Sequence, residues 1–167
     1  AGLTLQAAAT GMKVAVLEMQ DFSEGTSSRS TKLVHGGIRY LKNFDVEVVS
    51  DTVSERAVVQ SIAPHIPKPD PMLLPIYNDE GKTTFDMFSV KIAMDLYDRL
   101  AGIDEGSPYA NYTISPEEVL RREPLIKKKG LQGAGVYLDY RNNDSRLVID
   151  NIKKAVEDGA KAISKMK

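Results

Sequence analysis

The sequence contains no cysteine among its 167 residues. Without cysteine the chain can form no disulfide bond, no thiolate nucleophile and no cysteine metal site. Redox chemistry in this protein would therefore have to come from a bound cofactor. We predict no metal centre.

The sequence also lacks long apolar runs and an excess of charge of one sign. No run approaches the roughly 20 apolar residues that span a bilayer, and the apolar start has no basic leader typical of a signal peptide. The net charge is −1, which gives no electrostatic footprint for nucleic acid. With 42% hydrophobic and 27% charged residues, the composition is that of a globular protein. We expect a cytoplasmic protein that binds no nucleic acid; peripheral contact with a membrane stays open.

The N-terminal segment predicts part of a β-α-β unit. Residues 1–10 are rich in helix formers, and Gly11 follows them as glycine commonly follows a helix. Residues 13–18, KVAVLE, form a short apolar run typical of a buried parallel strand. No strand precedes the first helix, so the segment looks like a β-α-β unit that has been cut open.

Two amphipathic helices are predicted from the spacing of apolar residues. The first covers residues 44–62 and ends before Pro64, and the second covers residues 85–101. Ahead of them, the polar residues 20–38 predict an ordered loop with a short helix near residues 30–35. The spacing assigns two sets of side chains to the buried faces: Val46, Val49, Val53 and Ala57 in the first helix, and Phe88, Ile92, Leu96 and Leu100 in the second.

Proline and glycine punctuate the rest of the chain. Four prolines between residues 64 and 71 require an extended backbone, and Pro75 assigns the predicted strand at 72–77 to a sheet edge. A capping box from Ser115 to Glu118 opens a helix that ends before Pro124. The remaining predictions are a turn at 78–81, a connection at 130–135, a strand at 136–140, a helix at 145–158 capped by Asp144 and closed by Gly159, and a strand from Ala160 to Ile163.

Two segments could bind a nucleotide. In a dinucleotide-binding β-α-β unit, glycines lie at the turn before the helix, and an acid about 20 residues later binds the ribose hydroxyls. Gly2 and Glu18 are the candidates for these roles. The turn itself is missing, but Glu18 has the right place at the end of the second strand, although it also fits a surface residue at a strand end. The loop from Thr26 to Thr31 offers hydroxyls and backbone N–H groups suited to a pyrophosphate, although serine-rich loops commonly bind nothing.

The segment His35-Gly36-Gly37-Ile38-Arg39-Tyr40 could carry chemistry. Two glycines let another group approach the backbone closely. Arg39 offers a fork suited to a phosphate or carboxylate, and His35 could move a proton near neutral pH. The alternative is an ordinary turn with a histidine at its tip. The polar residues between Asp139 and Asp144 predict a turn and a helix cap, with a site role as the second interpretation.

Taken together, these residues resemble one family. LEMQDFSEGTSSRSTKLVHGGIRYL is similar to the segment after the first β-α unit of FAD-dependent glycerol-3-phosphate dehydrogenases. FDVEVVSDTVSERAVVQSIAPHIPKPDPMLLPIY is similar to their soluble bacterial branch, the alpha-glycerophosphate oxidases. AGLTLQAAATG resembles the stretch after that family's G-G-G-I-T-G fingerprint, and YLDYRNNDSRLVIDNIKKAVEDGA resembles a later stretch. The resemblance covers the whole chain, but the family's enzymes are several times longer, so we expect an N-terminal fragment.

The resemblance implies an α/β fold, a glutathione-reductase-like FAD-binding (Rossmann-type) domain with part of a substrate or cap domain. Residues 1–63 would form a partial FAD-binding domain without its first strand and fingerprint glycines. Residues 64–143 would belong to the substrate or cap region, and residues 144–167 would return to the FAD-binding domain. The implied cofactor is FAD.

The resemblance also implies roles for individual residues. Glu18 would bind the FAD ribose. His35 would lie near the reactive face of the flavin as the candidate base, and Arg39 would bind the substrate phosphate with Tyr40 beside it. The residues that would line the pyrophosphate and flavin are Thr26, Ser27, Ser28, Thr31, Lys32 and Leu33.

The implied reaction is oxidation of sn-glycerol 3-phosphate to dihydroxyacetone phosphate, with a hydride passing from C2 to the flavin N5. The electrons would then pass to oxygen, giving hydrogen peroxide, or to a quinone, and the resemblance favours oxygen. Two other classes stay open: a related flavoprotein that oxidises an amino acid, in which Arg39 would bind a carboxylate, and a non-catalytic module. Association into a homodimer also stays open.

Overall fold

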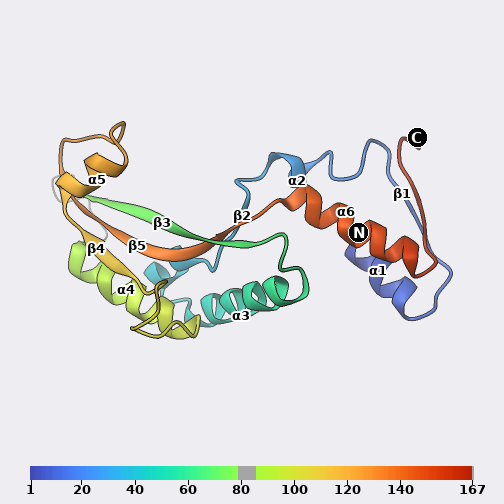
Figure 1. Cartoon of the computed structure of the whole chain (residues 1–167), viewed down its shortest axis with the longest axis horizontal. Coiled ribbons are helices and arrows are strands. Elements are labelled where there is room, and N and C mark those ends of the chain that lie inside the picture. Colours follow the sequence, from blue (N-terminus) through green and yellow to red (C-terminus); the bar gives the residue numbers. More distant parts are fainter. Residues whose placement is uncertain (79–85, 167) are drawn as a thin grey trace. The chain divides into compact units, whose positions relative to one another are not determined.

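The computed structural model describes residues 1–78 and 86–166, which form two compact units. Unit 1 comprises residues 1–33 and 142–167, and unit 2 comprises residues 34–141. Figure 1 shows the helices and strands of both units coloured along the chain. Each unit contains helices and strands, which confirms the predicted α/β class.

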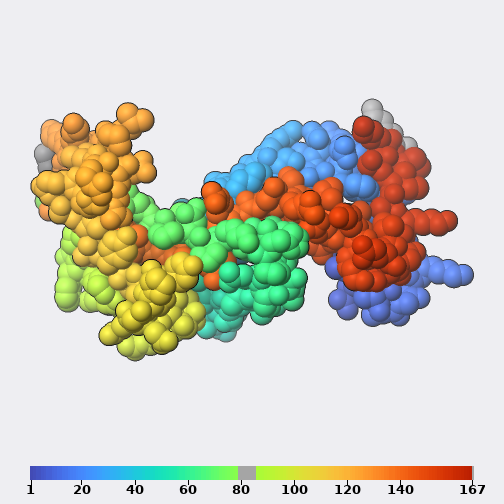
Figure 2. All heavy atoms as spheres, in the orientation of Figure 1, coloured from blue at the N-terminus to red at the C-terminus, as the bar shows by residue number. Residues whose placement is uncertain are grey.

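Unit 1 combines a parallel pair of strands with packed helices. β1 (Ala15–Leu17) pairs in parallel with β6 (Lys161–Ile163). α1 (Gly2–Ala9) packs against α6 (Asp144–Glu157), and Figure 2 shows their blue and red atoms side by side. Small side chains form the buried centre of the unit: Ala8, Ala155 and Ala160.

The predictions for unit 1 are confirmed at the helix ends. Gly11 and Gly159 follow α1 and α6 with φ of +81° and +99°, a conformation that glycine adopts without strain. The expected parallel strand is shorter than predicted and is not buried. Leu17 is 59% exposed because β6 is the only strand that pairs with β1 in the part of the chain that the structure describes.

Two further details of unit 1 differ from the predictions. The short helix of the hydroxyl-rich loop is α2 (Thr26–Arg29) rather than residues 30–35. The cap of α6 is Asn143, whose side chain accepts the Arg146 N–H at 3.0 Å. Asp144, the predicted cap, instead begins the helix and accepts hydrogen bonds from the side chains of Ser30 and Asn142.

Unit 2 contains an antiparallel sheet with its two longest helices on one face. β3 (Lys68–Tyr77) and β5 (Leu131–Arg141) form a long ladder. α3 (Val46–Ile62) and α4 (Met87–Leu100) lie on the same side of that ladder in Figure 1. The other elements of unit 2 are η1 (Ile38–Asn43), β4 (Tyr112–Ile114) and α5 (Pro116–Arg122), and β2 (Leu33–Val34) includes the last residue of the first segment of unit 1 and the first residue of unit 2. The sheet order is β2-β5-β3, and β4 also pairs with β5.

The core of unit 2 lies between these helices and the ladder. α3 contributes Val49 and Val53, and α4 contributes Val90 and Met94. Full burial of each such side chain contributes about 1.5–3 kcal/mol. η1 is attached to the same core because its Ile38 and Leu41 are buried there, and this packing fixes the segment that carries the predicted substrate residues.

The buried face of α4 differs from the prediction. Phe88 and Ile92 are 73% and 53% exposed, although their spacing assigned them to the core. The buried residues of α4 are instead Val90, Met94, Tyr97 and Asp98. Leu96 and Leu100 of the predicted set are partly buried against this core. The predicted face is thus wrong at Phe88 and Ile92, because the core side of α4 includes two polar residues whose partners lie elsewhere in unit 2.

The buried face of α3 is confirmed at Val49 and Val53 but not at its ends. Val46 and Ala57 are exposed, and Arg56 takes the next buried position. A charged residue is rarely buried unless it is paired, and the partner of Arg56 comes from β5.

The proline-rich strand lies at a sheet edge, as predicted. β3 pairs with β5 alone among the described strands, and its prolines at 69, 71 and 75 are two and four positions apart, so their missing N–H groups share one edge. Residues 130–135 were expected as a connection, but from Leu131 onward they belong to β5. A Cβ on Gly135 would lie 2.9 Å from Met94 Cε, so glycine here allows α4 to approach. Most of the predicted turn at 78–81 lies outside the described residues.

The remaining local predictions are confirmed. α5 begins with Pro116 at its first position, and the Ser115 side chain accepts the Glu118 N–H at 3.3 Å. β6 begins one residue later than expected. Within residues 1–78 and 86–166, no helix has both the length and the apolar character needed to cross a bilayer.

The two units group the residues differently from the predicted domains. Residues 34–63 pack with the sheet in unit 2, while residues 1–33 group with residues 142–167. The assignment of residues 1–63 and 144–167 to FAD binding, and of residues 64–143 to the substrate region, stays a prediction.

Candidate functional site

The candidate site residues fall into two groups, one in each unit. The boundary between the units follows Leu33. It separates the residues implied for the cofactor from those implied for the substrate. Unit 1 holds Gly2, Glu18, Thr26, Ser27, Ser28, Thr31, Lys32 and Leu33, and unit 2 holds His35, Arg39 and Tyr40.

Gly2 and Glu18 lie at the ends of regular elements in unit 1. Gly2 is the first residue of α1, which has no side-chain cap and no acidic residue in its first turn. The N–H groups of that turn can therefore serve an anion, which the helix dipole favours. Glu18 directly follows β1 and is half-buried. Its Oε1 accepts the Gln20 N–H at 3.0 Å, while no described residue donates to its second oxygen.

Side chains at the start of α6 order the hydroxyl-rich loop. The Ser145 hydroxyl donates to the Ser27 carbonyl at 3.2 Å, and the Lys32 ammonium donates to the same carbonyl at 3.0 Å. The Ser30 hydroxyl donates to the Asp144 carboxylate. In Figure 2 the blue atoms of the loop lie against the orange atoms at the start of α6. The structure thus brings Ser27 and Lys32 together with Ser145, which sequence analysis had not placed in a site.

The other loop residues differ in exposure. Thr26, Ser28 and Thr31 are exposed, and Leu33 is half-buried. Ser28 Oγ donates to the Ser23 carbonyl and lies 3.4 Å from Ser145 Oγ.

Asn142 places an unused acceptor beside this loop. Its backbone N–H donates to the Lys32 carbonyl at 2.7 Å, and its side-chain amide donates to Asp144 at 2.9 Å. The side-chain Oδ1 is buried and accepts no hydrogen bond from the part of the chain that is described. A buried polar atom without a partner is rare in folded proteins, so this oxygen fits a donor from a bound molecule or water.

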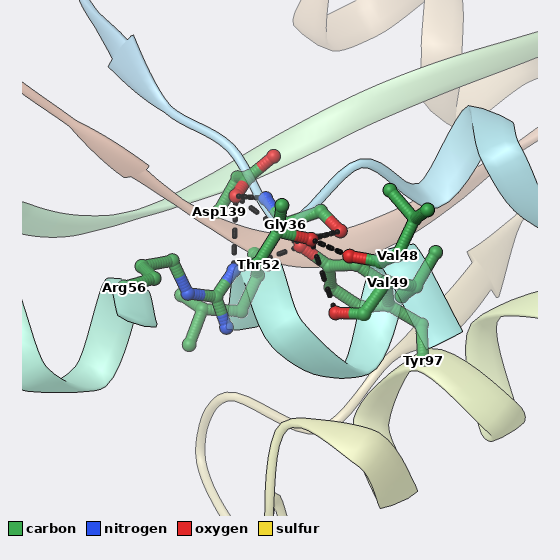
Figure 3. Close-up of polar contacts among 8 residues, drawn as sticks. Gly36, Val48, Val49, Thr52, Arg56, Tyr97 and Asp139 are labelled. Atoms are coloured by element: carbon green, nitrogen blue, oxygen red, sulfur yellow. Dashed lines mark hydrogen bonds and ion pairs between the residues drawn. The ribbon is translucent and has the colours of Figure 1, made fainter. Parts of the chain in front are cut away.

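In unit 2, side chains form hydrogen bonds with both the backbone N–H and the backbone carbonyl of Gly36 (Figure 3). The Gly36 N–H lies 3.0 Å from Asp139 Oδ1 and 3.1 Å from Tyr97 Oη. The Gly36 carbonyl accepts the Thr52 hydroxyl at 2.9 Å. Gly37 then adopts φ +74° and turns the chain into η1. The backbone is therefore fixed at the centre of the predicted substrate segment.

The side chains predicted to act on the substrate surround this fixed peptide and are exposed. His35 precedes Gly36, and its ring forms no hydrogen bond with any residue that the structure describes. Arg39 and Tyr40 follow in the first turn of η1. Together with Lys42, Arg39 lines an open cavity of about 250 Å³ whose other lining side chains are apolar: Ile38, Leu74, Val90 and Ala93.

A buried ion pair lies beneath this segment. Arg56 and Asp139 are 3% and 2% exposed, and Arg56 Nη1 lies 2.9 Å from Asp139 Oδ1. The same nitrogen donates to Tyr97 Oη at 2.8 Å and to the Leu138 carbonyl at 3.2 Å. The Arg56 guanidinium also lies over the Tyr140 ring, 4.6 Å from its centroid. Asp139, expected in a turn or cap, is instead a buried residue of β5.

The environment of this cluster changes its acid–base properties. Burial raises the pKa of the Asp139 carboxyl above its ordinary value, and the neighbouring Arg56 charge opposes this increase. Burial likewise raises the pKa of the Tyr97 hydroxyl, and it raises the pKa of Tyr137 to about 12. Tyr97 therefore keeps its proton at neutral pH and can donate to Asp139, 3.3 Å away.

Sequence reasoning missed Arg56 and Tyr97. The available signal was the position of each residue among apolar residues at helical spacing. A charged or polar side chain in such a position has to find a buried partner. No group of three or more His, Asp or Glu side chains in the described ranges could hold a metal ion.

The sequence of the whole chain, residues 1–167, matches the family described as FAD dependent oxidoreductase. The chain belongs to this family. The resemblance found in the sequence is confirmed by two curated relatives, both named alpha-glycerophosphate oxidase. The protein from Lactococcus lactis is 96% identical over all 167 residues, and that from Enterococcus casseliflavus is 70% identical. This chain covers 27% of each of these relatives.

A solved structure is similar to this family member over nearly its whole length. The glycerol-3-phosphate dehydrogenase from Bacillus halodurans, complexed with FAD, is 34% identical with a TM-score of 0.64. The match covers 99% of this chain and 24% of that chain. It confirms that the mixed helix and sheet arrangement is part of an FAD-dependent oxidoreductase fold.

Proposed function

We propose that the full-length protein oxidises sn-glycerol 3-phosphate to dihydroxyacetone phosphate, with FAD as cofactor and oxygen as electron acceptor, giving hydrogen peroxide. The observation that carries this proposal is the 96% identity, across the whole chain, to a protein named alpha-glycerophosphate oxidase. At this identity few site residues can differ between the two proteins over residues 1–167.

Unit 1 supplies groups that suit FAD. The uncapped first turn of α1 at Gly2 suits the pyrophosphate, and the second carboxylate oxygen of Glu18 suits the ribose hydroxyls. The unpartnered Oδ1 of Asn142 can accept from a hydroxyl or N–H of the cofactor. The loop residues that would line the pyrophosphate and flavin are Thr26, Ser27, Ser28, Thr31, Lys32 and Leu33. When bound, FAD supplies the acceptor for the hydride that leaves C2 of the substrate.

Unit 2 supplies groups that suit the substrate. The Arg39 guanidinium would bind the phosphate through paired hydrogen bonds, with Tyr40 beside it. Lys42 lines the same cavity as Arg39, so two cations border one small space. The His35 imidazole would accept the proton of the C2 hydroxyl, because histidine can take up a proton near neutral pH.

Steady-state assays of the full-length protein test the proposal. We expect hydrogen peroxide to form with glycerol 3-phosphate, and no turnover with amino acids at the same concentration. Turnover with an amino acid in place of glycerol 3-phosphate would contradict the proposal. It would favour the alternative in which Arg39 binds a carboxylate.

Replacing Arg39 by alanine should weaken substrate binding. We expect KM for glycerol 3-phosphate to rise about 10- to 100-fold, the range for losing hydrogen bonds to a charged group, while FAD stays bound. The matched control is Arg121→Ala, which removes an exposed arginine of α5 that pairs with Glu118 and should leave KM unchanged. Equal KM values for Arg39→Ala and the wild type would remove Arg39 from the site.

The isolated 167 residues should bind FAD weakly or not at all. Residues 1–167 contain no G-x-G-x-x-G turn, and among the described strands β1 and β6 form a two-stranded sheet. Titration of the isolated chain with FAD, followed by flavin fluorescence, measures this directly. Tight stoichiometric binding by the isolated chain would show that these residues form a complete cofactor site.

A further inference from the structure

We propose that Arg56, Tyr97 and Asp139 act as positioning residues, which fix the Gly36 peptide and thereby the places of His35 and Arg39 over the substrate. This inference rests on the proposed function for the identity of the substrate. The cluster itself is independent of that function, because it is defined by contacts within unit 2.

The three side chains converge on one backbone N–H. Asp139 Oδ1 and Tyr97 Oη both lie within 3.1 Å of the Gly36 nitrogen. Arg56 Nη1 contacts both of these oxygens, at 2.9 Å and 2.8 Å. Arg56 therefore orients the two acceptors for the Gly36 N–H, as the dashed lines around Asp139 in Figure 3 indicate. A charged acceptor makes this hydrogen bond stronger than one between neutral groups.

The packing leaves the Gly36 peptide little freedom to move. A Cβ at this position would overlap the Tyr97 hydroxyl and a Val53 methyl group, and would lie 2.8 Å from Tyr97 Cζ. On the carbonyl side, the Thr52 hydroxyl can donate its one proton to the Gly36 carbonyl. The Val48 carbonyl is a second possible acceptor for this proton, because it lies 2.7 Å from the Thr52 hydroxyl oxygen. The peptide is therefore bound on both sides and packed against side chains of α3 and α4.

The residues on either side of this peptide have exposed side chains. The side chains of His35 and Arg39 are exposed, so their positions depend on the backbone that carries them. A shift of about 1 Å in a positioning element can cost a large factor in catalysis. Buried ion pairs also add little net stability compared with apolar side chains of the same size. A role in fixing the site therefore accounts for a buried ion pair at this place.

The test uses Tyr97→Phe and Asp139→Asn in the full-length protein with FAD bound. Tyr97→Phe removes one acceptor of the Gly36 N–H without creating an unpaired charge, so it serves if Asp139→Asn does not fold. The control is Val119→Ala, because Val119 is fully buried in a separate cluster with Leu131 and Ala134 and should lower the melting temperature without touching the segment. Hydrogen exchange of a peptide spanning residues 33–44 and the steady-state constants are measured for each variant.

We expect exchange at Gly36 to be about tenfold faster in the two cluster variants, the loss expected for one hydrogen bond. KM for glycerol 3-phosphate should rise by a similar factor at unchanged FAD content, whereas Val119→Ala should change neither quantity. Unchanged exchange would overturn the proposal, and so would an unchanged KM alongside faster exchange. If the wild type does not oxidise glycerol 3-phosphate, the proposed function is wrong, and exchange alone then decides whether the three residues position the segment.

Discussion

Replacing Arg56 by methionine is expected to lower the local free energy of unfolding of unit 2 by about 3–5 kcal/mol, the cost of removing one partner of a buried ion pair. The side-chain volume of methionine is close to that of arginine, so most of the loss would come from charge and hydrogen bonds rather than from a cavity. Asp139 would keep the Gly36 N–H and the Tyr97 hydroxyl as partners but would lose the neighbouring positive charge. Native-state hydrogen exchange of amides in α3 and β5 measures this local free energy.

The defect of Arg56→Met should depend on pH. Burial already raises the pKa of Asp139, and Arg56 opposes that increase, so removing Arg56 raises the folded-state pKa further. A group whose pKa is higher in the folded state stabilises the fold when it is protonated, below its unfolded-state pKa, and this contribution is lost as pH rises through the folded-state pKa. The defect should therefore be largest at neutral pH and smaller in acid.

A double variant provides the control for this pair. Arg56→Met combined with Asp139→Leu removes both charges, and replacing a whole buried pair by apolar groups is often close to neutral. We expect the double variant to recover much of the stability lost in Arg56→Met. If Arg56→Met alone were as stable as the wild type, the Arg56–Asp139 pair would not be buried away from water, contrary to the structure.

Replacing Gly36 by alanine should have the second large effect, a loss of about 3 kcal/mol, at the upper end for adding an atom to a packed site. The added methyl group would overlap Tyr97 and Val53, both of which are buried. The Gly36 peptide would have to move, and the neighbouring segment with Arg39 would move with it. Local hydrogen exchange and KM of the full-length protein should both increase.

Gly106→Ala is the matched control for this substitution. A Cβ on Gly106 would meet no atom within 4 Å, and its φ is not in the left-handed region. Its stability should stay within about 0.5 kcal/mol of the wild type, as is usual for surface changes. If Gly36→Ala behaved like Gly106→Ala, the close approach of Tyr97 to the Gly36 backbone would be wrong.

Local signals in the sequence were sufficient for much of the fold. Gly11 and Gly159 end their helices and Ser115 caps α5, because these effects depend only on residues within one turn. The edge position of β3 followed in the same way, because Pro75 cannot donate to a neighbouring strand.

The errors have a common physical cause, since each depends on contacts between distant segments. The exposed stripe of Phe88 and Ile92 is more apolar than the true buried face of α4, which contains Tyr97 because its hydroxyl finds partners inside. Arg56 and Asp139 are 83 positions apart in the chain, so neither one predicts the burial of the other. The glycine-rich start of β5 was taken for a connection because sequence alone does not show that Met94 packs against Gly135.

The candidate site was predictable as a set of segments but not as a geometry. The resemblance named His35, Arg39 and Tyr40 together because they are contiguous. It gave no sign that side chains from α3, α4 and β5 fix the peptide between them. The contacts of Ser27 and Ser30 with the start of α6 were also hidden, since they join residues more than 100 positions apart.

The most direct test of the proposed function is anaerobic reduction of the full-length protein. Purified protein is mixed with glycerol 3-phosphate in the absence of oxygen, and the visible absorption of its flavin is recorded. The account predicts that one equivalent of glycerol 3-phosphate bleaches this absorption and that admitting oxygen restores it with formation of hydrogen peroxide. A protein without flavin, or a flavin that glycerol 3-phosphate leaves oxidised, would contradict it.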